Sequence, residues 1–318
     1  MNVFVAGATG VLGRRVVALL ITGGHHVVGL SRSPANSDWL TQHGAEARAG
    51  DLFDPEQMRD LTADCDAVLH LATAIPTNPQ TAASGWAVND RIRREGTRNL
   101  VEAALHGRCQ LYLQQSITLL YGDRNGAWVD ENTPIAAQSG GRLQSAADME
   151  QMVMDAMRER QLPAAILRFG SFYSDDSGHT RAMFEGVRQG TLTVIGDGGA
   201  YWNMIDVNDA ASAVARVVDI PAAAVSHVFN VCDDEPVTYA DLVDCIAQAL
   251  GVPPPARIPI PVAEQQMGAA AVRASRASVR CRNELFKATL GWQPPYPTYR
   301  EGIPAEIAKW LRALPPSP

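Results

Sequence analysis

The chain has 318 residues, of which 46% are hydrophobic, and a formal net charge of −7. This length suits one large α/β domain with an attached lobe, or two domains. The negative charge argues against a nucleic-acid-binding surface, and no apolar run approaches membrane-spanning length. We therefore expect a protein that binds small molecules, without a nucleic-acid or membrane partner.

The cysteines and the start of the chain bear on its compartment. Five cysteines are scattered through the sequence, with no CxxC pair and no Cys/His ligand spacing. This pattern predicts reduced thiols and no metal site. No basic segment precedes the first apolar run, so no secretory signal is expected. These features together predict a cytoplasmic protein.

The chain opens with a short apolar run, Val3–Ala6, followed by a glycine-rich segment up to Gly13. The run predicts a buried strand, and the glycines predict a tight turn into a helix over Arg14–Ile21. Gly7 and Gly10 let the backbone approach a ligand closely, and Gly13 lets the helix lie near the sheet. The start of that helix offers free N–H groups and a partial positive charge, so the segment predicts a phosphate site of the dinucleotide-binding kind.

Strands and helices alternate through the first half of the chain, which predicts a parallel, doubly wound sheet. The predicted strands are Val3–Ala6, His26–Ser31, Ala45–Ala49, Asp66–Leu71, Gln110–Gln115, Ala164–Phe169, Trp202–Val207 and His227–Val231. The predicted helices are Arg14–Ile21, a short one opened by Asp54-Pro55, Asn89–Leu105, Leu143–Arg160, Val207–Val218 and Tyr239–Leu250. The fold class is therefore α/β, a Rossmann-type doubly wound parallel sheet with a smaller C-terminal substrate lobe.

The remaining segments do not continue the sheet pattern. We assign residues 1–169 and 201–232 to the nucleotide-binding domain, and residues 170–200 and 233–318 to the lobe. The lobe is expected to cover the carboxyl ends of the strands, where open α/β sheets bind their ligands.

Short motifs recur along nearly the whole chain. They are Gly7-Ala-Thr-Gly-Val-Leu-Gly13, Gly50-Asp-Leu52, His70-Leu-Ala72, Gly96-Thr-Arg-Asn-Leu100, Ser116 followed by Tyr121-Gly122, Leu167-Arg-Phe-Gly170, Ile205-Asp-Val-Asn-Asp209 and Leu290-Gly-Trp292. Together they resemble the extended short-chain dehydrogenases/reductases, the NAD(P)-dependent epimerase/dehydratase-like family. The motifs are specific for this family and name no substrate.

The resemblance implies roles for the matching positions. The turn residues that should cradle the cofactor pyrophosphate are Thr9, Gly10, Val11 and Leu12, and Gly7 and Gly13 complete this part of the cofactor site. The residues that should flank the adenine are Asp51 and Leu52. Those that should lie along the ribose and nicotinamide are Leu71, Ala72, Thr73, Phe169, Gly170 and Phe172. For Leu71 and Ala72, core packing is an equally good reading.

The end of the second predicted strand bears on the choice of cofactor. NAD-specific relatives place an acidic residue there for the ribose hydroxyls. This chain has Ser31-Arg32 instead, with no carboxylate before Asp38. A hydroxyl and a guanidinium suit the 2′-phosphate of NADP. We therefore predict NADP rather than NAD, with a solvated surface arginine as the alternative.

A catalytic residue pair of the family is missing from this chain. The family uses a tyrosine and a lysine four residues apart on the helix after the serine strand, where the lysine lowers the tyrosine pKa. In this chain those positions are Arg142 and Ala146. No tyrosine occurs between Tyr121 and Tyr173, and no lysine precedes Lys287. The dyad is therefore absent in any register of this helix.

Ser116 and Tyr121 are the remaining candidate catalytic residues. The resemblance implies that Ser116 binds the substrate oxygen, although its spacing to Tyr121 is one residue longer than usual. Tyr121, Tyr173 and Tyr201 are candidate replacement acids, and structural packing is the alternative for each. Arg142 either binds an acidic substrate group or lies on the surface.

Three functions remain open on the sequence alone. The favoured one is an NADP-dependent reductase or dehydrogenase of a small or medium carbonyl or alcohol, because hydride transfer tolerates loss of the tyrosine. The alternatives are a nucleotide-sugar epimerase or dehydratase, and a non-catalytic NADP-binding sensor. The chain is expected to be a monomer or a homodimer paired through the helices at 89–105 and 143–160.

Overall fold

A computed structural model describes residues 1–76, 82–136, 141 and 143–314. Its centre is a parallel seven-stranded sheet in the order β12-β7-β5-β4-β1-β2-β3. The strands are β1 Asn2–Ala6, β2 His26–Ser31, β3 Glu46–Ala49, β4 Ala67–His70, β5 Leu111–Ile117, β7 Ala164–Phe169 and β12 His227–Val231. The strand order reverses between β1 and β4, which is where such sheets bind ligands. The predicted Rossmann-type fold is confirmed.

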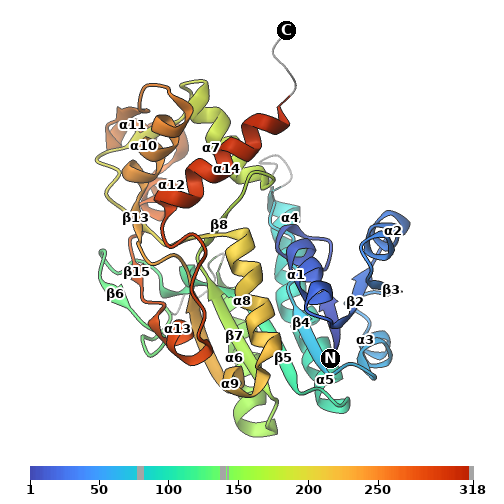
Figure 1. The fold of residues 1–318 in the computed structure, drawn as a ribbon. Coiled ribbons are helices and arrows are strands. Elements are labelled where there is room, and N and C mark those ends of the chain that lie inside the picture. Colours follow the sequence, from blue (N-terminus) through green and yellow to red (C-terminus); the bar gives the residue numbers. More distant parts are fainter. Residues whose placement is uncertain (77–81, 137–140, 142, 315–318) are drawn as a thin grey trace.

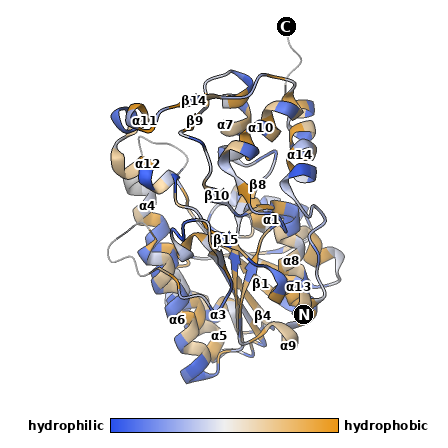
Figure 2. Ribbon diagram, turned by 90° about the vertical axis from the view of Figure 1, so that its left-hand side faces the viewer, coloured by the Kyte–Doolittle hydropathy of each residue, from blue (hydrophilic) through white to orange (hydrophobic). Residues whose placement is uncertain are grey.

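Helices cover both faces of the sheet (Figure 1). One face carries α1 Val11–Thr22 and α8 Val207–Asp219; the other carries α3 Pro55–Thr62, α5 Thr97–His106 and α6 Gln144–Arg160. Successive strand residues enter opposite cores: Val3 and Val5 face α1 and α8, whereas Phe4 faces α5. A strand buried on both faces reads as a continuous apolar run, which is why the sequence reveals it. Figure 2 shows hydrophobic residues along the strands and hydrophilic residues on the outer turns of the helices.

The lobe lies above the carboxyl ends of the strands (Figure 1). Its helices are α7 Gly178–Arg188, α10 Tyr239–Leu250, α11 Ile260–Met267, α12 Ala269–Ser275 and α14 Tyr299–Ala313. Short strand pairs join its segments: β9 Thr193–Ile195 with β14 Ala256–Ile258, and β10 Tyr201–Trp202 with β13 Val237–Thr238. Phe184, Ile246 and Trp310 belong to a core of its own. The lobe is therefore held together independently of the sheet.

The remaining elements flank the sheet or lie between it and the lobe. They are α2 Pro34–Gln42, α4 Ala82–Arg91, β6 Trp128–Val129, β8 Ser171–Tyr173, β11 Met204–Asp206, α9 Pro221–Ala224, β15 Arg280–Cys281 and α13 Glu284–Leu290. Two pairs of these strands are parallel, β8 with β11 and β6 with β15. No helix in the described ranges has both the length and the apolar character needed to cross a bilayer.

The structure differs from the predicted elements in three places. The strand predicted at Trp202–Val207 is two strands, β10 and β11, which pair outside the main sheet. The helix predicted from Asn89 starts at Ala82 and passes through a π-helical turn, Ile92–Gly96, before α5. Helix α2 was not predicted, although its Ser33 cap and the proline that follows are start signals. Its sequence is largely polar and only weakly amphipathic, so the spacing of its apolar residues does not indicate a helix.

Four carboxyl groups are buried where α8 meets the lobe: Asp206, Asp209, Asp233 and Glu306. Asp209 accepts a hydrogen bond from the backbone N–H of Tyr296 at 2.8 Å. Burial, and secondarily the charges of Asp206 and Glu306, raise the pKa of Asp209 to about 7. Asp209 therefore takes up a proton on folding at mildly acidic pH.

We expect this proton uptake to appear in the stability of the variant Asp209→Asn. A raised carboxyl pKa means that wild-type stability falls as pH rises from about 4 to 7, whereas the amide carries no such dependence. The stability difference in favour of Asp209→Asn should grow by roughly 1–3 kcal/mol between pH 5 and pH 8. Urea unfolding at both pH values measures it, with the exposed Asp60→Asn as control. A difference that does not change with pH would contradict the assignment.

Candidate functional site

The site is built around the turn from β1 into α1, which crosses the end of β4. Gly7 has φ +90°, and a Cβ on it would lie 2.6 Å from the backbone nitrogen of Ala72. A Cβ on Gly13 would lie 2.0 Å from the carbonyl oxygen of Gly7. Both positions therefore require glycine. The turn forms a cradle at the edge of the sheet that only backbone atoms line closely.

Helix α1 begins in this cradle with its first N–H groups free of a side-chain cap, because Gly10 stands at the cap position. Such a helix start binds phosphate groups. Nearby, Arg14 and Arg15 pair with Asp176 at 3.2 and 3.0 Å. Asp176 follows β8, so this contact ties the lobe to α1. The residues predicted to hold a pyrophosphate thus fit that group.

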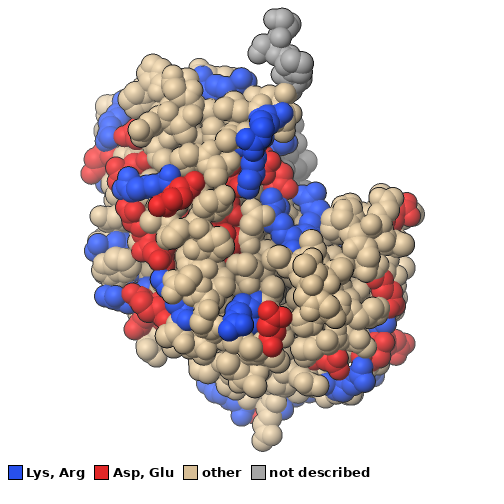
Figure 3. Space-filling model, in the orientation of Figure 1, with Lys and Arg blue, Asp and Glu red and all other residues tan. Residues whose placement is uncertain are grey.

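A pocket of about 620 Å³ opens beside the carboxyl ends of β2 and β3. Its lining includes Ser31, Arg32, Ser33, Ser37, Asp51 and Phe53. The N-terminus of α2 lies at the same pocket, because its cap residue Ser33 is one of the lining residues. In Figure 3 the surface is hollowed between the lobe and the part of the molecule that carries α2 and β3, with basic side chains in the hollow. The pocket and the cradle lie on adjacent strands of one sheet edge.

The predicted residues of this pocket are not equivalent. Arg32 is exposed and makes no hydrogen bond or ion pair with any described residue. The Ser31 hydroxyl is buried and donates to the carbonyl of Ser33 at 3.0 Å. Leu52 is also buried and packs against Gly96. Arg32 is therefore the free cation of the pocket, whereas Leu52 supports the pocket from the core.

The other predicted cofactor residues follow β4 and β7. Leu71 is buried and Thr73 is exposed, so the chain rises from the core to the surface here. Phe169, the last residue of β7, packs against Phe172 with ring centroids 5.4 Å apart. A Cβ on Gly170 would lie 2.8 Å from the carbonyl oxygen of Asn203, so glycine is required there too.

Ser116 does not have the predicted orientation toward a substrate. Its hydroxyl is buried and donates to Glu150 Oε1 at 2.5 Å. The reason is strand alternation, which puts Ser116 on the face that α6 covers. Arg168 completes the ion pair with Glu150, its Nη2 lying 2.6 Å from Oε2, and both side chains are almost completely buried.

Tyr121 belongs to the same buried network. Its hydroxyl donates to Asn230 Oδ1 at 2.9 Å and accepts from Arg168 Nη1 at 2.9 Å. Burial raises the pKa of Tyr121 to about 12, an unfavourable value for an acid–base group at neutral pH. The structure therefore assigns Tyr121 to packing rather than to proton transfer.

The other candidate acids are no better placed. Tyr173 is buried and its hydroxyl donates to Asp233 at 3.3 Å. The ring of Tyr201 contacts the guanidinium of Arg280 at 4.8 Å. Ala146, at the predicted lysine position, is fully buried, and the Arg142 position lies outside the described residues.

The sequence reasoning missed the Glu150–Arg168 pair. The available signal was Arg168 itself, an arginine inside an apolar strand that has a neighbouring strand on each side. A charge at such a position needs a buried partner. The sequence does not say which carboxylate it is, because Glu150 lies on another element.

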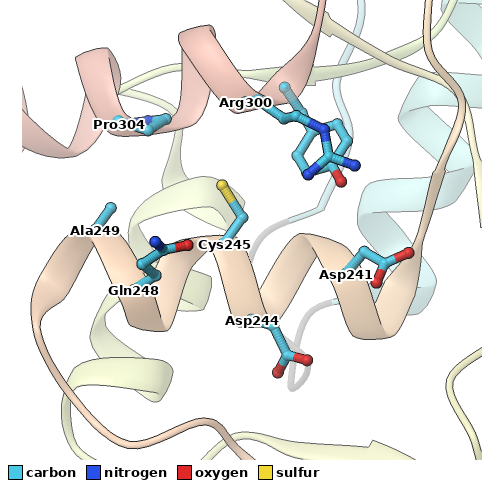
Figure 4. A pocket seen from close by; sticks show the side chains of 8 residues that line it. Asp241, Asp244, Cys245, Gln248, Ala249, Arg300 and Pro304 are labelled. Atoms are coloured by element: carbon cyan, nitrogen blue, oxygen red, sulfur yellow. The ribbon is translucent and has the colours of Figure 1, made fainter.

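A second hollow of about 530 Å³ lies in the lobe, between α10 and α14. Figure 4 shows Cys245 directed from α10 toward α14 and Arg300. Arg300 lies over the ring of Tyr299 and pairs with Glu235 at 2.9 Å. Burial raises the pKa of the Cys245 thiol, which disfavours the reactive thiolate. None of the predicted cofactor residues lines this hollow.

Comparison with known proteins places this geometry in a family. Residues 3–232 match the model of the NAD dependent epimerase/dehydratase family. A 3-diazoavenalumate denitrifying reductase from Streptomyces is 27% identical over 96% of this chain and 100% of its own length. A 2-alkyl-3-oxoalkanoate reductase from Shewanella oneidensis is 29% identical over 80% of this chain and 67% of its own.

A solved structure shows the same fold. The UDP-glucuronic acid 4-epimerase of Bacillus cereus, in complex with UDP-glucuronic acid and NAD, superposes with a TM-score of 0.79. The superposition covers 99% of this chain and 100% of that one, at 19% identity.

We expect Glu150→Gln to destabilise the protein by about 3–5 kcal/mol, because it leaves the Arg168 charge buried without a counter-charge. Replacing both partners by methionine should cost less than the sum of the single replacements. Denaturant unfolding measures both. Glu102→Gln is the matched control, since its ion pair with Arg160 is solvent-exposed and should contribute under about 1 kcal/mol. A Glu150→Gln protein as stable as this control would refute the network.

Proposed function

The chain belongs to the NAD dependent epimerase/dehydratase family, and from this premise we propose that it is an NADPH-dependent reductase of a small or medium electrophile. The observation that carries the cofactor choice is Arg32, an exposed guanidinium without a partner among the described residues, in the pocket next to the phosphate cradle. The capped start of α2 and the hydroxyl of Ser37 lie in the same pocket. This combination suits a 2′-phosphate.

Two relatives named as reductases support the direction of the reaction. An epimerase or dehydratase needs reversible deprotonation of its substrate, for which the described part of α6 offers neither tyrosine nor lysine. Hydride delivery depends mainly on positioning of cofactor and substrate. The residues that remain are therefore better suited to a reductase.

The missing dyad also limits which compounds can accept the hydride efficiently. NADPH, when bound, supplies a hydride; a ketone must gain a proton as well, whereas an arenediazonium ion takes the hydride and releases N₂ without a proton. The Streptomyces relative is named as a reductase of a diazo compound and aligns over nearly all of both chains. A diazo arene is thus a candidate substrate beside a carbonyl compound, and the missing dyad favours the diazo arene.

The cofactor choice has a direct test. NADPH should bind more tightly than NADH, and Arg32→Ala should remove most of that preference, because a charge-assisted contact contributes about 1.5–3 kcal/mol. Fluorescence titration of both cofactors against both proteins measures it. Arg59→Ala, at an exposed arginine of α3 outside the pocket, is the control and should leave both affinities unchanged. Equal wild-type affinities for the two cofactors would refute the choice.

The acceptor has a second test. With deuterium at the transferable position of NADPH, an arenediazonium salt should yield deuterated arene and N₂. Its turnover should exceed that of ketones and aldehydes by at least about 10²-fold, the usual contribution of a positioned acid. Protein-free reactions with the same cofactor give the background.

Ketone turnover as fast as diazonium turnover would contradict an acid-free site. Tight NADPH binding without oxidation by any member of the panel would favour the non-catalytic sensor instead.

A further inference from the structure

Arg93 is a buried cation at the carboxyl end of the sheet. The residue is 6% exposed and lies on the π-helical turn Ile92–Gly96 between α4 and α5. Such turns inside α-helices occur frequently at functional sites. Its hydrogen bond is to a neutral group: Nη1 donates to Ser145 Oγ at 3.3 Å. Ser145 lies in the first turn of α6.

No carboxylate of the described residues forms an ion pair with Arg93. Asp90 is reached only through Ser145, whose hydroxyl donates to Asp90 Oδ1 at 2.6 Å. The stretches outside the described ranges contain no aspartate or glutamate. The neighbouring Arg94 differs, since it pairs with Asp148 at 2.7 Å. Arg93 is therefore a buried charge without a direct counter-charge, an arrangement that proteins seldom keep without a use.

The contacts around Arg93 locate it near the end of β4 and beside α6. Four residues before it, Asn89 accepts a hydrogen bond from the N–H of Ala74, in the segment after β4. Four residues after it, Thr97 donates to Gln114 of β5 at 3.5 Å. Arg93 therefore lies between these two levels and beside α6. This is the corner formed by the ends of β4 and β5 and the start of α6.

From this placement we propose that Arg93 binds a carboxylate group of the substrate, next to the position where the reduced atom is held. The proposal rests on the proposed function for the word substrate, but not for the anion site. A planar guanidinium matches a carboxylate in shape, and its Nε and Nη2 make no hydrogen bond to described residues. With the Asp90 carboxylate behind Ser145, the site offers at most one positive charge, so a carboxylate suits it better than a phosphate dianion.

The position of the family's missing lysine lies next to this site. Ala146, which follows the partner of Arg93, is fully buried and has no charge. The positive charge beside the start of α6 comes from the neighbouring helix instead. In this chain it is fixed to hold an anion, and it is not paired with a tyrosine.

Calorimetric titration of benzoate into the NADP⁺-saturated protein tests the proposal without requiring turnover. Wild type should bind benzoate, Arg93→Met should bind it at least tenfold more weakly, and Arg93→Lys should be intermediate. Arg94→Met, one residue away, should stay within twofold of wild type. Urea unfolding is the second readout: Arg93→Met should be no less stable than wild type, because it removes an unpaired buried charge.

Three binding results would overturn the proposal: no benzoate binding by wild type, equal binding by Arg93→Met, or binding of inorganic phosphate in preference to benzoate. A large loss of stability in Arg93→Met would also overturn it, since Arg93 would then be a structural tie between the π-helical turn and α6. The protein could bind benzoate through Arg93 and yet fail to oxidise NADPH with any acceptor of the panel. That result would refute only the proposed function.

Discussion

The close crossing of the β1–α1 turn over the end of β4 is the constraint on which the rest of the site depends. The backbone at Gly7 approaches that of Ala72 so closely that no Cβ fits between them, and the first turn of α1 folds back onto Gly7 in the same way. This contact fixes where α1 begins and leaves its free N–H groups at the switch point of the sheet. The pocket at the carboxyl ends of β2 and β3 is placed relative to it.

The end of β5 shows that residues at the family's motif positions can form a buried network while the fold stays the same. Ser116 and Tyr121 occupy motif positions, yet both hydroxyls belong to a buried network with Glu150 and Arg168. That network joins β5, β7 and α6 into one rigid unit. Neither hydroxyl is left free by the described residues, and the buried cation Arg93 lies beside the start of the same helix, α6. A reductase that needs little from a proton donor is consistent with this arrangement.

Most of the sheet was predictable because strands that are buried on both faces appear in the sequence as apolar runs. The phosphate cradle was predictable because the spacing of its glycines indicates where the backbone must pass too closely for a Cβ. The free cation Arg32 was also predictable, from its place at the end of a strand. The direction of Ser116 was not, because it depends on which helix covers that face of β5. Arg93 was not predicted, because a run of charges on a helix usually indicates a solvent-exposed face. Only the packing of α4 and α5 against α6 shows that one residue of this run is buried.

The central claim is that this sheet edge holds NADP with its 2′-phosphate at the start of α2. A crystal structure of the NADP⁺ complex tests it most directly. The account predicts the 2′-phosphate within hydrogen-bond distance of the Arg32 guanidinium, the pyrophosphate at the start of α1, and the nicotinamide over the end of β5. A 2′-phosphate directed into solvent with Arg32 turned away, or a nucleotide bound elsewhere on the molecule, would contradict it.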